Sequence, residues 1–428
     1  MRFNTLSQWL DWQASLHPTA INLGLDRVVA VAANLTPKPR NTHVITVGGT
    51  NGKGSCVGYL ESILLAGGYR VGAYTSPHLE RYNERVRIAG CEVDDAALCA
   101  AFERVDQGRG NTSLTYFEFG TLAALDIFWH EQLDVVVLEV GLGGRLDAVN
   151  IVDADCAIVT NVALDHIEWL GPDRESIGRE KAGIFRAGRA AVCADRNPPV
   201  SLLQTADGIG AELWRIGRDF DWQRRQENAA WQVKTRNGTI DNLPLPRMPG
   251  AHQLDNAAAA LAALQALNGR LPLEAEAIRA GIAATQLPGR FEILPGEPAT
   301  ILDVAHNPDA ARVLAEALAA TRGEGRTLAV LGMMRDKAID EVAAVLAPQV
   351  DQWYLASLPG PRGLDADELR DRLAAVLAPA DCELAGTPWQ AWQQAEAAAQ
   401  AGDRIVVCGS FVTVADVRAN WHAGAMEH

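Results

Sequence analysis

The stretch from His43 to Ser55, HVITVGGTNGKGS, decides the fold. Its first half is an apolar run with the length of one buried strand, and its second half is a turn rich in glycine. The residues that follow, SCVGYLESILLAGG (55–68), have helical spacing and end in a glycine stop. A strand, a glycine-rich turn and a helix in this order are typical of a parallel α/β sheet with a phosphate site at the start of the helix.

The turn itself suits a nucleotide phosphate. Glycine lets backbone N–H groups surround an anion, and Lys53 supplies a positive charge near the hydroxyl of Ser55. The common P-loop pattern is matched only in part, because Val47 replaces its first glycine and Gly54 follows the lysine directly. The alternative is a glycine turn that only ends the strand and binds no phosphate. The lysine in the turn and the helix that follows it disfavour this alternative.

Two further apolar segments, LDVVVLEVG (133–141) and ADCAIVTNVA (154–163), are predicted strands that also end in polar residues. Because the carboxyl ends of parallel strands meet at one edge of a sheet, we expect the site at that edge. Between residues 219 and 245 the alternation of AAWQVKTRNGTIDNLPL, with Asn237-Gly238 at a turn, predicts a β-hairpin excursion.

A second α/β series begins near Ala299, where ATILDVAH, RTLAVLGMM, QWYLAS and DRIVVCGSF are predicted strands. Residues 287–298 carry three prolines and two glycines, which marks them as the domain junction. The predicted class is therefore α/β. A P-loop parallel-sheet N-terminal domain (1–292) carries the small β excursion, and a smaller Rossmann-like α/β domain (293–428) follows it.

The composition excludes several classes of protein. The formal net charge of -15 leaves no basic surplus to neutralise a nucleic-acid backbone. The seven cysteines form no CxxC pair, which predicts buried free thiols in a reducing compartment. There is no N-terminal signal pattern and no apolar run as long as a membrane span. We expect a cytoplasmic protein with neither a nucleic-acid nor a membrane partner.

Polar residues follow two of the strands near the phosphate loop. Ser76, after the short strand RVGAYTSP, is a candidate Mg²⁺ ligand, although a helix cap is the better supported interpretation. His78 is a candidate for a local hydrogen bond or for a ligand. Glu139 ends the VVVLE strand, where a buried carboxylate either holds Mg²⁺ or pairs with Arg145.

Two more candidates follow the next strand. His166 stands beside Asp165, so it is either a metal ligand with an acidic neighbour or a structural histidine. Lys181 lies in REKAGIF, which is predicted to open a helical turn. An ordinary surface lysine is the alternative for Lys181, and the residues alone do not reject it.

The second domain repeats the arrangement of a strand, an acidic end and a helix start. Asp303 and His306 face one crevice if the helix begins at Pro308. The alternative is that Asn307 is a plain helix cap and the other two are incidental.

Together these motifs resemble the folylpolyglutamate synthase/dihydrofolate synthase family, within the Mur-ligase-type enzymes. The resemblance spans roughly residues 20 to 415 and rests on nine segments in a fixed order. They are GGTNGKGS, TSPHLERYNERVRI, TYFEFGTLAAL, LEVGLGGRLDAVN, VTNVALDHIEWLG, REKAGIFR, HQLDNAAAALAAL, LPGR and LDVAHNPDAA.

The resemblance implies an ATP-dependent ligase. ATP phosphorylates a substrate carboxylate, and the amino group of L-glutamate attacks the acyl phosphate to give an amide, ADP and phosphate. The implied acceptors are dihydropteroate, which becomes dihydrofolate, and reduced folates such as tetrahydrofolate, which become polyglutamates. The implied cofactors are ATP and Mg²⁺, with room for a monovalent cation such as K⁺. We expect a monomer, because two domains already enclose such a site.

The family's functional residues carry over position by position. The ATP ligands would be Asn51, Gly52, Lys53, Gly54, Ser55, Asn256, Arg290 and Asp303. The Mg²⁺ ligands would be Ser76, Glu139 and His166. The residues nearest the chemistry would be Glu139, His166, Lys181 and His306, and Lys181 matches a lysine that is carbamylated in this family. The pterin site would use Gly24, Thr115, Tyr116, Phe117, Glu118, Leu146, Asp147 and Ala148. Two departures are small: Ser55 stands where many relatives have Thr, and Tyr116 where many have Phe.

Three alternatives remain beside the bifunctional enzyme. One is a folylpolyglutamate synthase with a single activity. A cell-wall Mur ligase is disfavoured, because the residues before the phosphate loop are too few for a domain that binds a uridine moiety. A P-loop switch NTPase is also disfavoured, because it needs no second α/β domain with its own strand-end acid and histidine.

Overall fold

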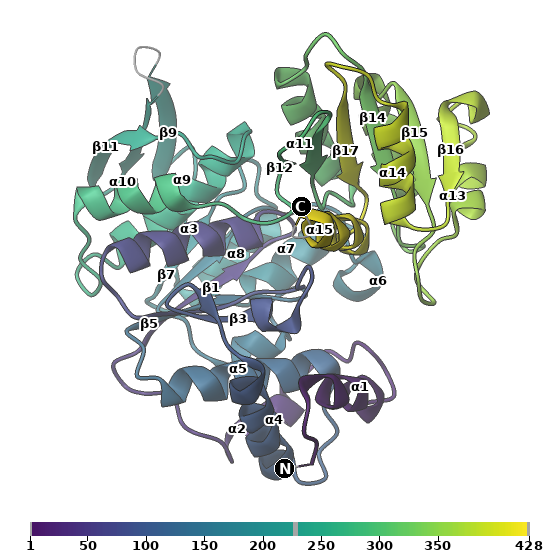
Figure 1. Cartoon of the computed structure of the whole chain (residues 1–428). Helices are drawn as coiled ribbons and strands as arrows, with labels where there is room; N and C mark the ends of the chain where they lie inside the picture. Colours follow the sequence, from purple (N-terminus) through teal and green to yellow (C-terminus); the bar gives the residue numbers. More distant parts are fainter. Residues whose placement is uncertain (1, 226–229, 426–428) are drawn as a thin grey trace. The chain divides into compact units, whose positions relative to one another are not determined.

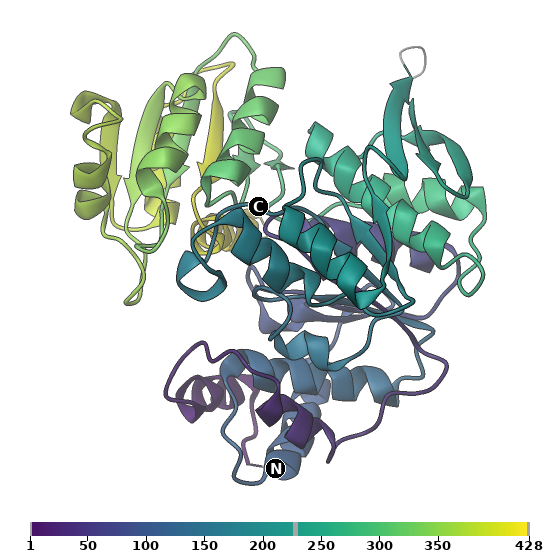
Figure 2. The same ribbon diagram turned by 180° about the vertical axis from the view of Figure 1, so that it is seen from behind.

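The computed structural model describes residues 2–225 and 230–425, and it divides into two compact units. Unit 1 comprises Met1–Arg247 and His252–Thr285, and unit 2 comprises Met248–Ala251 and Gln286–His428. Each unit is an α/β structure built around its own sheet (Figures 1 and 2). The expected fold class is thereby confirmed. The division precedes the expected boundary at residue 292, because Glu292 already pairs with Leu302 in the sheet of unit 2.

The main sheet of unit 1 has the strand order β4-β3-β2-β5-β1-β6-β7-β8. Strand β1 lies between β5 and β6 and is parallel to both, so the three predicted strands form the centre of the sheet. The edge strands β3 and β4 are antiparallel. The strands are β1 (His43–Gly48), β2 (Val71–Tyr74), β3 (Val86–Ile88), β4 (Cys91–Glu92), β5 (Val135–Glu139), β6 (Cys156–Val159), β7 (Ala190–Cys193) and β8 (Glu212–Arg215).

Helices cover both faces of this sheet because its central strands are apolar on both sides. Val44, Val136 and Leu138 pack with α1, α2, α4 and α5, whereas α3 contacts β1, β2 and β5 and also packs on α10. The helices of unit 1 are α1 (Leu6–Leu16), α2 (Asp26–Ala32), α3 (Lys53–Ala66), η1 (Tyr82–Arg85), α4 (Asp95–Arg109), α5 (Tyr116–His130), η2 (Ala148–Ile151), α6 (Ile167–Leu170), α7 (Arg174–Ala182), α8 (Val200–Ile209), α9 (Ala251–Ala266) and α10 (Ala275–Ala284).

The β excursion is a separate antiparallel sheet of β9 (Phe220–Arg225), β10 (Ala230–Thr235) and β11 (Gly238–Pro244). Thr235 pairs with Gly238, so the predicted turn at Asn237-Gly238 is confirmed. The sequence predicted a hairpin, and the structure adds β9, which pairs with β10 along its length. Residues 226–229, which include the first residue of the predicted hairpin, lie outside the described residues.

The sheet of unit 2 has the order β12-β13-β17-β14-β15-β16, parallel except for β12. The four predicted strands are present, and β12 and β16 were not predicted. The strands are β12 (Glu292–Leu294), β13 (Ala299–Leu302), β14 (Thr327–Leu331), β15 (Gln352–Ala356), β16 (Cys382–Ala385) and β17 (Arg404–Cys408). The helices are α11 (Pro308–Ala320), α12 (Ile339–Leu346), η3 (Ala347–Gln349), α13 (Ala366–Leu373), η4 (Pro379–Asp381), α14 (Pro388–Ala398) and α15 (Phe411–Ala425).

The composition predicted buried free cysteines and no membrane-spanning segment. All seven cysteines are free thiols, but Cys91 is exposed and Cys382 is half-buried, so burial holds for five of them. Within the described ranges, no helix has both the length and the apolar character needed to cross a membrane.

Candidate functional site

The phosphate loop joins the end of β1 to the start of α3, as the sequence predicts. Gly52 caps the helix in the left-handed conformation, with φ of 81°. A Cβ at Gly52 would stand 2.5 Å from Oδ1 of Asn256, and one at Gly49 would stand 1.8 Å from Oγ1 of Thr160. Both glycines therefore permit backbone approaches that no other residue allows.

The loop is held from one side by the segment that follows β6. Asn161 accepts from the backbone N–H of Thr50 through its carbonyl (2.9 Å) and from that of Asn51 through its side chain (2.8 Å). Thr160 Oγ1 donates to the carbonyl of Asn51 at 2.6 Å. These bonds fix the loop before any ligand arrives, which is the arrangement that phosphate binding requires.

Helix α9 supports the loop from another direction. Its Asn256 is buried and lies against Gly52. Gln253, one turn earlier, donates from Nε2 to Oγ of Ser55 at 3.4 Å and accepts from Tyr59 at 3.4 Å. Gln253 is not among the predicted ligands, although its spacing of three residues from Asn256 on a helix was a usable signal.

Two lysines share one carbonyl of this loop. Nζ of Lys53 donates to the carbonyls of Gly49 (3.2 Å) and Thr50 (3.1 Å), and Nζ of Lys181 donates to Gly49 at 2.8 Å. Lys181 is only 3% exposed, so it is not a surface lysine. It lies near the end of α7, whereas the sequence predicts that a helical turn opens here.

The environment of Lys181 disfavours its charged form. Burial, followed by the positive charge of Lys53, lowers the pKa of Lys181 from 10.5 to about 7, while Asp165 and Asp147 act in the opposite direction. An amine with this pKa is partly neutral near neutral pH and is therefore nucleophilic. A lysine pKa lowered this far beside a phosphate loop is a marker of functional chemistry.

Glu139 and Ser76 come together at the carboxyl end of the sheet. Glu139 is the last residue of β5, is 4% exposed, and accepts from the backbone N–H of Ser76 at 3.1 Å. Ser76 caps no helix, because residues 77–81 are not helical and the next helix, η1, is capped by Arg81. The cap interpretation of Ser76 is therefore wrong. Arg145, the alternative partner of Glu139, forms an ion pair with Glu180 at 2.9 Å.

His166 lies in a left-handed turn immediately before α6, with φ of 52° and a side chain that is 37% exposed. Its Nε2 lies 3.9 Å from Oδ2 of Asp165. Within residues 2–225 and 230–425, no group of three or more His, Cys, Asp and Glu side chains could by itself hold a metal ion. A metal here would need ligands of other kinds, which is usual for Mg²⁺ on nucleotide phosphates.

His78 forms a local hydrogen bond, which was one of its two interpretations. Its Nδ1 accepts from Nε of Arg85 at 2.8 Å. Burial and then the charge of Arg85 lower the pKa of His78 from 6.5 to about 4, so it is neutral at physiological pH.

The first segment expected to bind the pterin forms the start of α5. Thr115 caps the helix, and Glu118 accepts from the backbone N–H of Thr115 at 2.7 Å, which completes a capping box. Arg27 donates to Oε1 of Glu118 at 2.7 Å and to the carbonyl of Asn22, which ties the loop around Gly24 to this helix. Thr115 and Glu118 are thus buried and engaged, and they position the segment.

Tyr116 and Phe117, between them, are only half-buried. The guanidinium of Arg85 lies 5.8 Å from the ring of Tyr116. A Cβ at Gly141 would stand 2.5 Å from the ring of Phe117, so this ring packs directly on the turn that follows β5. The structure therefore places this expected pterin segment against the turn that follows β5.

Asp147 organises the other segment, which contains Leu146 and Ala148. It caps η2 and accepts from the backbone N–H groups of Leu142 (2.8 Å) and Val149 (3.0 Å). Burial raises the pKa of Asp147 to about 6, although these N–H donors oppose the rise. Asp147 and Ala148 are buried, which leaves the half-buried Leu146 as the accessible member of the three.

In unit 2, Asp303 follows β13 directly and fixes the turn around Arg290. Its carboxylate accepts from the backbone N–H of Phe291 and of Ala305, both at 2.9 Å. Burial raises its pKa, and the charge of Arg290 opposes the rise. The guanidinium of Arg290 lies 5.3 Å from the ring of Phe411.

The helix α11 begins at Pro308, as predicted, and Asn307 caps it by accepting from the backbone N–H of Ala310 at 2.9 Å. Nδ1 of His306 lies 2.9 Å from the carbonyl of Val304, and its ring lies 6.0 Å from that of Phe411. Arg290 and His306 thus flank the same aromatic ring. Asn307 therefore caps α11, and this capping does not prevent Asp303 or His306 from contacting a ligand.

This fold and site define an ATP-dependent ligase of the Mur type. Residues 47–264 match the family model of the Mur ligase middle domain, and residues 289–411 match that of the Mur ligase, glutamate ligase domain. The second match contains every residue of unit 2 that the sequence predicted to be functional.

More narrowly, the chain belongs to the dihydrofolate synthase/folylpolyglutamate synthase family. It is 50% identical over 412 residues to the dihydrofolate synthase/folylpolyglutamate synthase of Escherichia coli, covering 96% of this chain and 94% of the relative. The structure of the E. coli enzyme with DHPP and ADP is similar with a TM-score of 0.92, 49% identity and coverage of 99% of each chain. A bifunctional relative with Mn, AMPPNP and L-glutamate bound has a TM-score of 0.89, 47% identity and 98% coverage of each chain.

Proposed function

We propose that this enzyme joins L-glutamate first to dihydropteroate, giving dihydrofolate, and then to reduced folates, giving polyglutamates. In each reaction a substrate carboxylate attacks the γ-phosphorus of ATP and displaces ADP. The amino group of glutamate then attacks the acyl carbon of the acyl phosphate, and phosphate leaves. The observation that carries the proposal is the buried Lys181, whose Nζ lies 2.8 Å from the carbonyl of Gly49 inside the phosphate loop.

The phosphate loop binds the ATP phosphates in this proposal. The N–H groups from Gly52 to Ser55 would face the anion at the start of α3, where the helix dipole also favours negative charge. Lys53 now donates to carbonyls of its own loop, and it exchanges those bonds for phosphate oxygens when ATP binds. Asn256 buttresses the turn at Gly52, so its contribution is to position the loop as well as to contact the nucleotide.

Mg²⁺ would be held by Ser76, Glu139 and His166. The carboxylate of Glu139 already lies beside Ser76, and both supply oxygen atoms, which Mg²⁺ prefers. His166 supplies a nitrogen, so we assign it a weaker or water-mediated contact. The ion would screen the charge of the phosphates, and K⁺ is a candidate for a further cation.

Carbamylation gives Lys181 its role in the proposal. The neutral amine attacks CO₂, one proton is released, and the side chain becomes an anionic carbamate. A pKa of about 7 makes the amine available for this step. The carbamate nitrogen keeps one N–H, which can maintain the bond to the carbonyl of Gly49. A negative group at this position orients the metal and the acyl carboxylate without repelling Lys53.

The pterin ring would bind where the half-buried Tyr116 and Phe117 meet the turn at Gly141. Thr115 and Glu118 hold that segment through their capping box, and Arg27 extends it to the loop of Gly24. The presence of both pterin segments favours a bifunctional enzyme over one with only folylpolyglutamate synthase activity.

For unit 2 we propose that Arg290 and Asp303 take part in ATP binding and that His306 takes part near the incoming glutamate. Asp303 already fixes the backbone next to Arg290, so its contribution includes positioning. We further propose that the enzyme acts as a monomer in the cytoplasm. Light scattering on the purified protein tests the first of these two statements, and cell fractionation tests the second.

The reaction is tested by ADP release with ATP, Mg²⁺ and L-glutamate present. Dihydropteroate, tetrahydrofolate and a nucleotide-linked muramyl precursor are added in turn, and products are identified by mass. We expect the first two to stimulate turnover and the third to have no effect. Stimulation by tetrahydrofolate alone would indicate the single-activity enzyme, and stimulation by neither pterin would contradict the proposal.

A further inference from the structure

An ion pair joins α3 to β3 beside the loop that carries Ser76. Its members are Glu61 on α3 and Arg87 on β3. Nε of Arg87 donates to Oε1 and Oε2 of Glu61 at 3.2 and 3.1 Å, and Nη2 donates to Oε2 at 2.8 Å. The Glu61 side chain is 9% exposed and that of Arg87 is 17% exposed, so the pair is largely shielded from water. A forked contact of this kind fixes the plane of the guanidinium as well as its position.

The third nitrogen of the same guanidinium reaches the Ser76 loop. Nη1 of Arg87 donates to Oγ1 of Thr75 at 3.0 Å and to the carbonyl of Glu84 at 2.9 Å. Thr75 directly precedes Ser76, and its own hydroxyl donates to the carbonyl of Glu84 at 3.3 Å. Arg87 therefore connects α3, which begins at the phosphate loop, with the backbone next to Ser76.

Other bonds tie this loop to residues 84–87 but do not reach α3. Thr75 donates its backbone N–H to the carbonyl of Arg85 at 2.9 Å. The carboxylate of Glu84 accepts from three backbone N–H groups at 2.6 to 2.7 Å, those of Leu79, Glu80 and Arg81. The loop and residues 84–87 thus form one braced piece, and the pair of Glu61 with Arg87 attaches this piece to the helix.

This attachment matters because Mg²⁺ would bind on both sides of it. In the proposed function the nucleotide phosphates lie at the start of α3, and Ser76 supplies a ligand from the braced loop. Glu61 follows Ser55 by six residues, so about 9 Å of rigid helix separates the ion pair from the phosphate loop. Mg²⁺ demands ligand distances close to about 2.0–2.1 Å in a near-ideal octahedron. A small shift of Ser76 relative to the phosphates would therefore weaken metal binding more than nucleotide binding.

We propose that Arg87 is a positioning residue for the metal. Together with Glu61 and Thr75 it sets the place of Ser76 relative to the phosphate loop. The inference rests on the proposed role of Ser76 as an Mg²⁺ ligand. A purely structural ion pair would affect the stability of the fold and leave the effect of Mg²⁺ on nucleotide binding unchanged.

The test measures how far Mg²⁺ strengthens nucleotide binding to the full-length enzyme. The Kd of AMPPNP, an ATP analogue that is not hydrolysed, is determined by calorimetry with saturating Mg²⁺ and again with EDTA. The ratio of the two Kd values is the metal enhancement, which we expect to be at least about 30-fold for the native enzyme. Neither titration contains a pterin or glutamate, so the result does not depend on turnover.

Two variants locate the effect. Arg87→Lys keeps the positive charge, but an ammonium lacks the planar fork that holds Glu61 and Thr75 in a fixed geometry. It should lower the metal enhancement about tenfold, with the Kd in EDTA changed by less than about twofold. Thr75→Val keeps the ion pair and removes only the hydroxyl that accepts from Arg87, so it should lower the enhancement about twofold to fivefold. If Arg87→Lys does not fold, Thr75→Val still decides.

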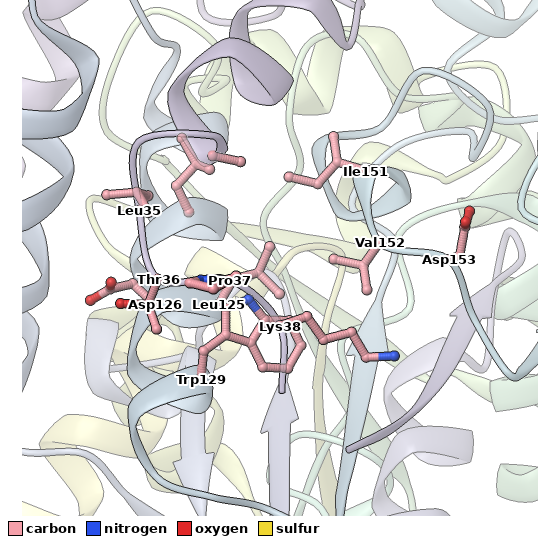
Figure 3. Close-up of a pocket in the computed structure, with 12 residues that line it drawn as sticks. Leu35, Thr36, Pro37, Lys38, Leu125, Asp126, Trp129, Ile151, Val152 and Asp153 are labelled. Atoms are coloured by element: carbon pink, nitrogen blue, oxygen red, sulfur yellow. The ribbon is translucent and has the colours of Figure 1, made fainter. Parts of the chain in front are cut away.

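Arg104→Lys is the matched control, because it changes another arginine of unit 1 that pairs with a buried carboxylate. Nε of Arg104 donates to Oδ2 of Asp126 at 2.6 Å. Asp126 lines the pocket drawn in Figure 3 together with residues 36–38 and 151–153, which precede β1 and β6. The control therefore lies toward the amino ends of the strands, away from the metal site. It should lower the stability in urea unfolding and leave the metal enhancement at the native value.

Three results would overturn the inference. They are a native enzyme without metal enhancement, an enhancement that either Arg87→Lys or Thr75→Val leaves at the native value, and an equal loss of enhancement in Arg104→Lys. The first would also remove the proposed metal site. The second and third would leave the ion pair a structural role only. None of them decides the ligase reaction, which is assayed separately with dihydropteroate and glutamate.

Discussion

Replacing Lys181 with methionine should abolish the ligase and yet stabilise unit 1. The native side chain is a buried amine, and its pKa falls from 10.5 in the unfolded chain to about 7 in the folded one. Methionine has a similar length and no charge, so the variant escapes the cost of burying an amine. Activity is expected to fall at least about 100-fold, because the proposed carbamate cannot form on methionine.

The magnitude follows from proton linkage. Between pH 7 and 10.5 the unfolded chain holds a proton that the folded chain has lost, so the stability of the native protein rises with pH in that window. The cost of burying Lys181 is greatest below pH 7, at about 5 kcal/mol, and it disappears above pH 10.5. The methionine variant also loses the hydrogen bond to the carbonyl of Gly49, which lowers its gain in stability by about 1 kcal/mol. At pH 7.5 the methionine variant should therefore be more stable by up to about 3 kcal/mol.

The assay is urea unfolding of both proteins at several pH values from 7 to 9.5, in buffers freed of CO₂ and followed by tryptophan fluorescence. The stability difference should shrink by about 1.4 kcal/mol for each pH unit. Lys234→Met, at an exposed position of β10, is the control and should show no such trend. A difference that does not change with pH would refute the assignment of a buried, easily deprotonated amine.

Three further predictions concern the rest of the site. Glu139→Gln should fold normally, because the amide oxygen still accepts from the N–H of Ser76. Its turnover should fall at least about 100-fold, because the amide lacks the negative charge that would balance Mg²⁺. Near-native turnover at low Mg²⁺ would contradict this prediction. Gly52→Ala places a Cβ 2.5 Å from Asn256 at a left-handed φ and should raise the KM for ATP about tenfold or more, as initial rates will show; an unchanged KM would mean that the turn relaxes freely. Thr115→Val removes a helix cap and should cost about 1 kcal/mol in urea unfolding, together with a higher KM for dihydropteroate; loss of stability without any change in KM would leave the segment a structural role only.

The sequence predicted those structural elements that a local pattern of residues determines. Apolar runs of strand length identified the centre of both sheets, and Asn237-Gly238 identified the turn of the excursion. Strand β16 was missed because Cys382–Ala385 is short and contains Glu383, so it has no apolar run. The sequence predicts a helical turn from Arg179, but α7 already begins at Arg174. Its residues are mostly polar and so show no apolar periodicity, and its N-cap, Asp173, was not identified.

Errors at the site arose where distant residues decide the environment. The residues around Ser76 are typical of a helix cap, but its backbone N–H donates to the carboxylate of Glu139, 63 residues away. Lys181 carries no sequence mark of burial, because the carbonyl that it contacts belongs to a loop 132 residues earlier. Gln253 was missed for the same reason, since its partner Ser55 lies on another helix. The family resemblance supplied the proposed role of Lys181, and the structure shows that this side chain is buried and that its pKa is lowered.

The proposed ligase reaction can be measured through its first glutamate addition. Purified enzyme is incubated with ATP, Mg²⁺, L-glutamate and dihydropteroate, and ADP and pterin products are measured in the same sample. We expect dihydrofolate and ADP in equal amounts, with no ADP above background when either dihydropteroate or glutamate is left out. ADP release that is independent of both substrates, or the absence of dihydrofolate, would contradict the proposed reaction.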